Sequence, residues 1–177
     1  AKPAASVMQY INQYLPDDIA VVSLEEVDER FHARFNAVHK TYCYRVLNSE
    51  IPHVFDRRYV YQVTDELNIV AMKKAALLLC GSHDFKSFTS NKKGNKTTVR
   101  TVQNIQIKQT GAEIDMVFTG DGFLYNMIRI MVGTLLEVGM CKRKPEEMTA
   151  ILKGLNRELA GPTAPAQGLC LESVDYE

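Results

Sequence analysis

Residues 121 to 139, DGFLYNMIRIMVGTLLEVG, form an apolar run with a single arginine, Arg129, near its middle. At helical spacing both faces of the run are apolar, so the sequence predicts a helix from about Phe123 to Val138 that is buried on nearly all sides. An arginine keeps its charge, and an unpaired charge in such a place is costly. We therefore expect Arg129 to meet a carboxylate or a phosphate.

Two interpretations of Arg129 are open at this point. The arginine can belong to a functional site, with Gly133 one helical turn away leaving room for an approaching group. It can instead be structural, either paired internally with an acid such as Asp84 or Asp121 or extended toward water at the helix end. Residue types alone weigh the two about equally, because structural ion pairs also explain buried arginines.

A second candidate is the basic segment from 84 to 100, DFKSFTSNKKGNKTTVR, which has no acid after Asp84. Exposed lysines suit contacts with phosphate groups, and aromatic neighbours suit stacking on bases. The alternative is an ordinary solvated loop. We favour nucleic acid because the positive charge is concentrated here, whereas the whole chain has no formal net charge. The candidate RNA contacts are Lys92, Lys93, Lys96 and Arg100.

The segment KTYCYRV, residues 40 to 46, places Tyr42 and Tyr44 on the same side of an expected strand. From residue type alone, such a pair is more typical of packing than of chemistry. The sequence has no phosphate-binding glycine loop, nucleophile elbow or metal-ligand spacing. Its four cysteines and four histidines are scattered, which argues against zinc and a disulfide framework and suits a reducing cytosol.

The elements that would position these groups are of mixed type. The chain has 177 residues, 46% hydrophobic and 24% charged, as in an ordinary globular protein. The apolar run is too short and too charged to span a membrane. The element order predicts an α+β fold with a largely antiparallel mixed sheet and helices packed on one face. The patterns predict a short helix after Ser6, strands at 19–27, in two segments of 31–48 and at 168–174, a helix from Thr64 or Asp65 to Cys80, a hairpin over 102–118, and a helix from Pro145.

Several stretches occur in the order found in the tRNA pseudouridine synthase A family, and the chain resembles that family over essentially its whole length. The most specific are FHARF followed by K-x-Y-x-Y and the block M-I-R-x-x-V-G-x-L-x-x-V-G. Four further stretches match the family in the same order: NQYLPDDIAV, GSHDFKSF, the loop ending in TVR, and APAQGLCLESVDY. The resemblance implies an isomerase that converts uridine to pseudouridine at positions 38 to 40 of the anticodon arm of tRNA. It also implies a homodimer and no need for a cofactor or metal; the cytoplasmic location that we expect rests on the scattered cysteines.

By motif position, the resemblance also implies roles for individual residues. Tyr42 matches an active-site tyrosine that packs on the target base, and Arg129 matches the arginine that pairs with the catalytic aspartate. Leu169 matches an apolar residue of the base pocket. Phe123 and Asn126 are expected near the site from helix geometry.

The resemblance has one important gap. The family's aspartate lies in a G-R-T-D-A-G-V-H block ahead of the LP-x-DI segment, and residues 1–177 contain no such block. We therefore interpret residues 1–177 as the C-terminal catalytic and RNA-binding domain of such a synthase, without the N-terminal domain, and expect this chain alone to be inactive. Arg34 and the basic segment are expected to lie toward the RNA. The alternative is a non-catalytic RNA-binding or dimerisation module of the same fold.

Overall fold

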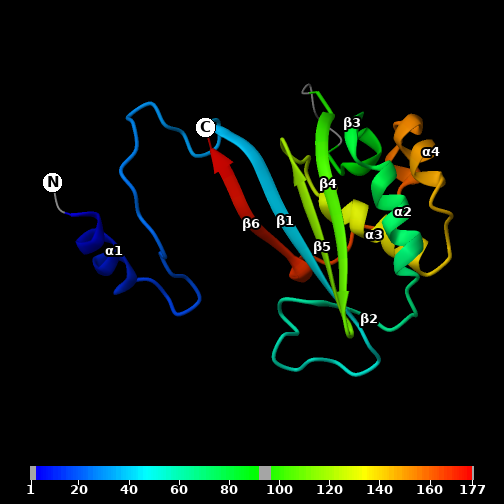
Figure 1. The fold of residues 1–177 in the computed structure, drawn as a ribbon, viewed down its shortest axis with the longest axis horizontal. Helices are drawn as coiled ribbons and strands as arrows, with labels where there is room; N and C mark the ends of the chain where they lie inside the picture. The colour runs from blue at the N-terminus through cyan, green and yellow to red at the C-terminus, as the bar shows by residue number, and fades with distance from the viewer. Residues whose placement is uncertain (1–2, 92–96, 177) are drawn as a thin grey trace. The chain divides into compact units, whose positions relative to one another are not determined.

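The computed structural model describes residues 3–91 and 97–176, and the chain divides into two compact units, Ala1–Asn36 and Ala37–Glu177 (Figure 1). The first unit contains the expected short helix, α1 (Ala4–Asn12), but this helix begins before Ser6, after Pro3, and not after Ser6. None of its residues is buried.

Two strands expected in the first unit are wrong. Residues 19–27 form no strand. The backbone of Val21 bonds instead to the side chain of Asn12, whose Oδ1 accepts from the Val21 N–H at 2.7 Å and whose Nδ2 donates to the Val21 carbonyl at 2.8 Å. Residues 31–36 form turns, in which the Phe35 and Asn36 N–H groups donate to the His32 carbonyl. A β-branched sequence becomes a strand only where a partner strand satisfies its backbone groups.

The second unit is built on a six-stranded sheet in the order β2-β1-β5-β4-β3, with β6 paired to β1. The pairs β1–β5, β1–β6, β4–β5 and β3–β4 are antiparallel, and β1–β2 is parallel. The strands are β1 (Ala37–Asn48), β2 (Tyr61–Val63), β3 (Gly81–Asp84), β4 (Val99–Thr110), β5 (Glu113–Gly120) and β6 (Leu169–Tyr176). The hairpin and the last strand are thus confirmed, whereas β2 and β3 were not expected.

Three helices cover one face of this sheet, α2 (Ile69–Leu78), α3 (Met127–Gly139) and α4 (Glu147–Gly154) (Figure 1). Three short 3-10 turns complete the unit: η1 (Lys86–Phe88), η2 (Arg157–Leu159) and η3 (Ala166–Gly168). The predicted α+β class, with its largely antiparallel mixed sheet and helices on one face, is confirmed. Among the described residues, no helix is long and apolar enough to cross a membrane.

Three helices begin later than the sequence suggested: α4 begins at Glu147 rather than at Pro145, and the later starts of α2 and α3 each have a local cause. The side chain of Asn68 accepts a hydrogen bond from the Ala71 N–H at 2.9 Å and so caps α2 just before Ile69, past the expected Thr64 or Asp65. Asn126 adopts a left-handed backbone with φ of 59°, so α3 begins at Met127 rather than at Phe123.

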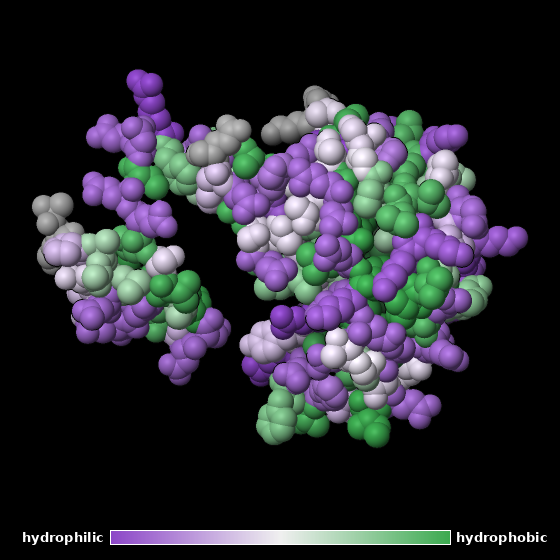
Figure 2. Space-filling view, viewed as in Figure 1, coloured by the Kyte–Doolittle hydropathy of each residue, from purple (hydrophilic) through white to green (hydrophobic). Residues whose placement is uncertain are grey.

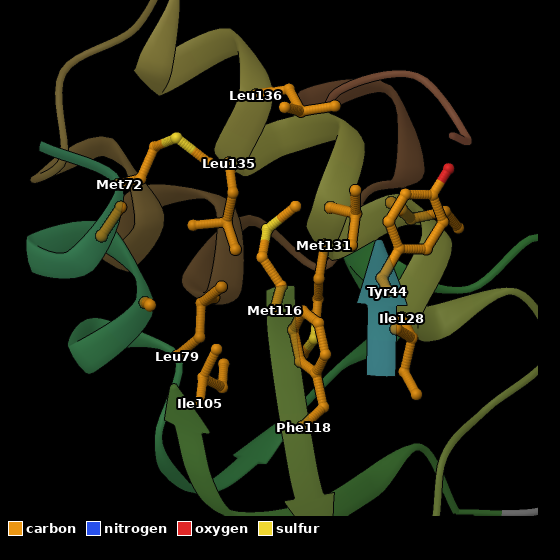
Figure 3. Packing of buried hydrophobic residues seen from close by; sticks show 14 of the residues in the cluster. Tyr44, Met72, Leu79, Ile105, Met116, Phe118, Ile128, Met131, Leu135 and Leu136 are labelled. Carbon is orange, nitrogen blue, oxygen red and sulfur yellow. The ribbon is translucent and has the colours of Figure 1, made fainter. Parts of the chain in front are cut away.

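The core lies between the sheet and the helices. In Figure 3, Met116 and Phe118 of β5 point toward Met131 of α3, and Leu79, which directly follows α2, and Leu135 of α3 close the layer on the other side. Every residue of α3 except Arg129 and Glu137 is buried, which confirms the burial expected from the apolar run. A well-packed helix of this kind gives the residues at its first turn a fixed position relative to β1 and β6.

Candidate active site

A hollow of about 220 Å³ lies at the start of α3, and it gathers five of the residues singled out from the sequence. They are Tyr42, Phe123, Asn126, Arg129 and Leu169, and residues 124 to 128 complete the lining. The rings of Tyr42 and Phe123 meet edge to face, with centroids 5.5 Å apart and planes at 89°. The pairing of β1 with β6 carries Leu169, distant in sequence, to this place.

Arg129 makes two hydrogen bonds in this hollow, both to neutral groups. Its Nε donates to the carbonyl oxygen of Ala164 at 2.6 Å, and its Nη1 donates to Asn126 Oδ1 at 3.1 Å. Within residues 3–91 and 97–176, no carboxylate lies within ion-pair distance of the guanidinium and its Nη2 has no hydrogen-bond partner. Arg129 is half-buried rather than fully enclosed, so its free edge opens toward the hollow.

The structure excludes the two internal partners considered for Arg129. Asp84 Oδ1 accepts from the Thr98 hydroxyl at 2.5 Å and from the Lys86 N–H at 3.0 Å. Asp121 Oδ1 accepts from the Thr101 N–H at 3.0 Å. Each carboxylate therefore organises a local turn or strand end, and the interpretation of Arg129 as half of an internal ion pair with either acid is wrong.

Asn126 joins Arg129 to the beginning of the basic segment. While its Oδ1 accepts from Arg129, its Nδ2 donates to Ser90 Oγ at 2.9 Å. The carbonyl of Tyr125 accepts from the Thr89 hydroxyl at 3.2 Å and from the Ser90 N–H at 3.4 Å. Residues 89 and 90 are thus tied to the two residues just before α3, which places the chain leading into the lysines beside the hollow. Ser90 was not expected as a site residue, and in the sequence only its position beside the lysines could have indicated this role.

A segment that runs along α3, residues 161–165 and here called the strap, contacts Arg129 on its other side. The Ala164 N–H donates to the Arg129 carbonyl at 3.0 Å, and Arg129 Nε donates to the Ala164 carbonyl, so the two residues form a reciprocal pair of hydrogen bonds. The Gly161 N–H donates to Thr134 Oγ1 at 2.9 Å. The room expected beside Gly133 is occupied by this strap, because a Cβ on Gly133 would lie 1.8 Å from the carbonyl oxygen of Pro162.

Tyr44 fixes the far end of the strap. Its side chain is buried beside α3, and its hydroxyl donates to the carbonyl oxygen of Pro165 at 2.7 Å (Figure 3). Burial raises the pKa of the Tyr44 hydroxyl above its usual range, and the neighbouring Tyr61 raises it further, while Arg129 acts in the opposite direction. Tyr44 is therefore a neutral anchor, whereas Tyr42 lines the hollow and its hydroxyl has no hydrogen-bond partner among the described residues.

Two other candidates among the described residues, Arg100 and Arg34, do not line the hollow. Arg100 lies on β4, with its Nη1 donating to the carbonyls of Thr97 and Val99, and its side chain lies beside Gly122. Arg34 is exposed and belongs to the first unit. Lys92, Lys93 and Lys96 lie outside the described residues. A larger hollow of about 350 Å³, lined by Arg45, Asp56, Tyr59, Glu113 and Asp115 among others, contains none of the expected site residues.

These contacts define what the hollow can hold. Tyr42, Phe123 and Leu169 offer aromatic and apolar surface for a flat ring, and Arg129 offers a cationic edge for an anion. Among the described residues, no group of three or more His, Cys, Asp or Glu side chains could hold a metal ion. The arrangement suits a protein that takes up a single base next to a negatively charged group.

Comparison with known proteins identifies the family to which this chain belongs. The sequence profile of a family described as tRNA pseudouridine synthase matches residues 75–177, more than half of the chain. The chain belongs to the tRNA pseudouridine synthase family.

Individual relatives agree over nearly the whole chain. The tRNA pseudouridine synthase A 2 of Clostridium tetani is 44% identical over 174 residues, which cover 98% of this chain and 70% of the relative. The tRNA pseudouridine synthase A of Bacillus subtilis is 45% identical over 175 residues, covering 99% and 71%. That of Moorella thermoacetica is 46% identical over 166 residues, covering 94% and 68%. The chain therefore spans about 70% of the length of these relatives.

Proposed function

We propose that this chain forms the base-binding part of a tRNA pseudouridine synthase that isomerises uridine to pseudouridine at positions 38 to 40 of the anticodon arm. The observation that carries the proposal is the hollow in which Tyr42, Phe123 and Leu169 surround the free edge of Arg129. A uridine turned out of its stack would pack against the Tyr42 ring, with Leu169 bounding the pocket. Asn126 holds Arg129 in place and links it to the chain that leads into the basic segment.

The proposed reaction is an isomerisation, so it consumes no redox or group-donating cofactor, and we propose that it proceeds without a metal. A carboxylate attacks the target nucleotide, and the bond between the base nitrogen N1 and the sugar breaks. The base then turns and rejoins the sugar through carbon C5, which releases the C5 proton, while N1 gains one. The Tyr42 hydroxyl, which has no partner among the described residues, is the group of this hollow that we assign to proton transfer.

The attacking carboxylate is the partner that we propose for Arg129. Two donor positions of the guanidinium are used by Ala164 and Asn126, and Nη2 remains available among the described contacts. A cation beside a carboxylate keeps the carboxylate ionised and holds it in a fixed orientation. No acid of the described residues occupies this place, so we propose that the nucleophile comes from a segment outside residues 1–177.

The release of the C5 hydrogen provides a direct test. Unmodified tRNA that carries tritium at C5 of its uridines would be incubated with the 177-residue chain and with the product of its reading frame expressed from its own start codon. We expect the longer product to release tritium and to stop doing so with Arg129→Met, while the 177-residue chain releases none. Tritium release by the 177-residue chain, or undiminished release by the Arg129→Met variant, would overturn this assignment of the nucleophile and its partner.

The alternative function is a non-catalytic RNA-binding module, and the lack of a carboxylate beside Arg129 among the described residues favours it. In that case Arg129 would meet an RNA phosphate rather than a nucleophile. The same tritium experiment separates the two functions, because a binding module would retain tRNA on a filter but release no tritium in either form. Arg129→Met would then weaken tRNA retention, which the catalytic proposal expects to change little.

We further propose that the protein works as a cytoplasmic homodimer with tRNA as its partner. The loop between β1 and β2 supports a contact with a second copy, because it exposes Ile51, Val54 and Phe55, the last to 92%. Figure 2 shows hydrophobic residues at the lower edge of the second unit, where this loop lies in Figure 1. Sedimentation equilibrium of the wild type and of Phe55→Glu tests the contact, with a shift of the variant toward monomer as the expected result.

A further inference from the structure

Cys43 and Cys170 lie directly opposite each other on the neighbouring strands β1 and β6. Residues opposite each other on antiparallel strands project from the same face of the sheet, with Cα atoms about 4.5 to 5.5 Å apart. A disulfide bond needs Cα atoms roughly 4.4 to 6.8 Å apart. The register of these two strands therefore provides the backbone spacing that a disulfide requires, although both cysteines are free thiols in the structure.

The two thiols differ in accessibility and in reactivity. Cys170 is exposed, whereas Cys43 is buried with 6% of its surface accessible. The Sγ of Cys43 lies 3.9 Å from Asp115 Oδ1. Burial, reinforced by the negative charge of Asp115, raises the pKa of the Cys43 thiol to about 11, so this thiol is a poor first nucleophile. An oxidant from solution meets Cys170 first.

The pair also lies directly behind the candidate active site. Successive residues of a strand point to opposite faces, so Cys43 points away from the face that carries Tyr42, and Cys170 away from the face that carries Leu169. The Cβ atoms of opposite residues are about 4.5 to 5.5 Å apart in a sheet and about 3.8 Å apart in a disulfide. Closing the bond would draw β1 and β6 together directly beside Tyr42 and Leu169, the chain neighbours of the two cysteines that line the hollow.

We propose that Cys43 and Cys170 form a dithiol oxidation site, at which glutathione disulfide closes a cross-strand disulfide and a thiol reductant reopens it. In the first step the Cys170 thiolate attacks glutathione disulfide, which forms a Cys170–glutathione mixed disulfide and releases one glutathione thiolate. In the second step the Cys43 thiol gives up its proton to solvent past Asp115, and its sulfur attacks the Cys170 sulfur and displaces the second glutathione. The protein loses two hydrogen atoms in total, and one glutathione disulfide is reduced to two glutathione molecules.

Peptide mapping tests this proposal on the 177-residue chain and needs no measurement of tRNA modification, so the result is independent of the proposed function. The reduced protein is incubated with glutathione disulfide, its remaining thiols are alkylated, and its peptides are identified by mass spectrometry. We expect a linked Cys43–Cys170 peptide in the wild type. Cys141, which is also exposed, serves as the internal control and should retain glutathione as a mixed disulfide.

Two variants assign the steps. In Cys43→Ala, Cys170 should accumulate the mixed disulfide to the level seen at Cys141, and in Cys170→Ala, Cys43 should remain reduced. The proposal is overturned if Cys170 holds as much glutathione in the wild type as in Cys43→Ala. Thermal unfolding gives a second measurement, because a cross-link that closes a loop of this length should raise the melting temperature of the oxidised wild type by roughly 5 °C or more. An equal rise in Cys43→Ala would also contradict the proposal.

Discussion

The two ends of α3 each carry a charged side chain, and the two charges have opposite surroundings. Arg129, in the first turn, has only neutral partners among the described residues, the carbonyl of Ala164 and the side chain of Asn126. Glu137, near the last turn, is paired with Arg143. Both ends hold the same stretch of chain, because Arg143 Nη1 donates to the carbonyl of Leu159 at 2.9 Å, just ahead of the strap.

The difference separates a structural arginine from a candidate catalytic one. Arg143 contacts a carboxylate of its own chain and a backbone carbonyl, so its positive charge already has a counter-charge. Arg129 also bonds to a backbone carbonyl, but it has no acidic partner among the described residues and lines a hollow. A half-buried cation without a counter-charge destabilises the fold, so a contribution to stability does not explain its presence and a function can. The comparison therefore predicts that Arg129 matters for turnover and Arg143 for stability.

The largest expected effect is on turnover, from Arg129→Met in the product of the full reading frame. We expect the rate of tritium release to fall by about 1000-fold or more, because the nucleophilic carboxylate loses its counter-charge. The free energy of unfolding should change by no more than about 2 kcal/mol, since two hydrogen bonds of about 1 kcal/mol each are lost. Urea unfolding of the same preparation checks the second number. A variant that is inactive because it is unfolded would break the comparison.

The next effect is structural, from Gly133→Ala. The new Cβ would lie 1.8 Å from the Pro162 carbonyl oxygen, so the strap must move off α3. We expect a loss of roughly 3 kcal/mol in the free energy of unfolding, together with reduced turnover, because Ala164 would leave Arg129.

Gly111→Ala in the β4–β5 turn provides the control for Gly133→Ala. Its backbone has a φ of 60° but no atom within 4 Å of the added Cβ, so only about 1 kcal/mol of backbone strain is expected and turnover should be unchanged. Equal losses of stability in the two alanine variants would show that the strap does not depend on Gly133.

A smaller loss of stability is expected from Arg143→Met, at roughly 2 kcal/mol, with no change in turnover. The side chains of Arg143 and Glu137 are 23% and 25% exposed, so removing Arg143 leaves the partly buried carboxylate of Glu137 without a counter-charge. Lys142→Met serves as the control, because Lys142 is exposed and forms no ion pair among the described residues. Urea unfolding of both variants measures the difference, and a loss of turnover in Arg143→Met would erase the distinction between the two ends of α3.

The sequence predicted the burial of α3 and the strand that carries Tyr42, because both depend on local periodicity. The resemblance to the family then pointed to Tyr42, Arg129 and Leu169, and helix geometry pointed to Phe123 and Asn126; the structure gathers all five in one hollow. The strap could not be foreseen, since its contacts with Thr134 and Tyr44 join residues far apart in the sequence and use backbone groups that leave no pattern. The expected strand at 19–27 failed for the converse reason, because local composition suggested a strand for which the fold provides no partner.

The smallest expected effect concerns the third anchor of the strap and depends on pH. Tyr44→Phe removes the hydrogen bond to the Pro165 carbonyl and should cost about 1 kcal/mol at neutral pH. Burial raises the pKa of Tyr44 in the folded state above its value of about 10 in the unfolded chain, so the folded state holds the proton more tightly. The stability that Tyr44 contributes is therefore complete below pH 10 and is lost above it, by up to about 1.4 kcal/mol per pH unit.

The difference between the wild type and Tyr44→Phe isolates this contribution, because the other groups are shared by the two proteins. Cys43, whose pKa is raised to about 11 by burial, also reduces stability at alkaline pH, but it does so equally in both. Urea unfolding at pH 8, 9, 10 and 11 should show the advantage of the wild type shrinking above pH 10. A constant difference across this range would mean that the Tyr44 hydroxyl reaches water, and that the strap end beside Arg129 is held less firmly than the end beside Arg143.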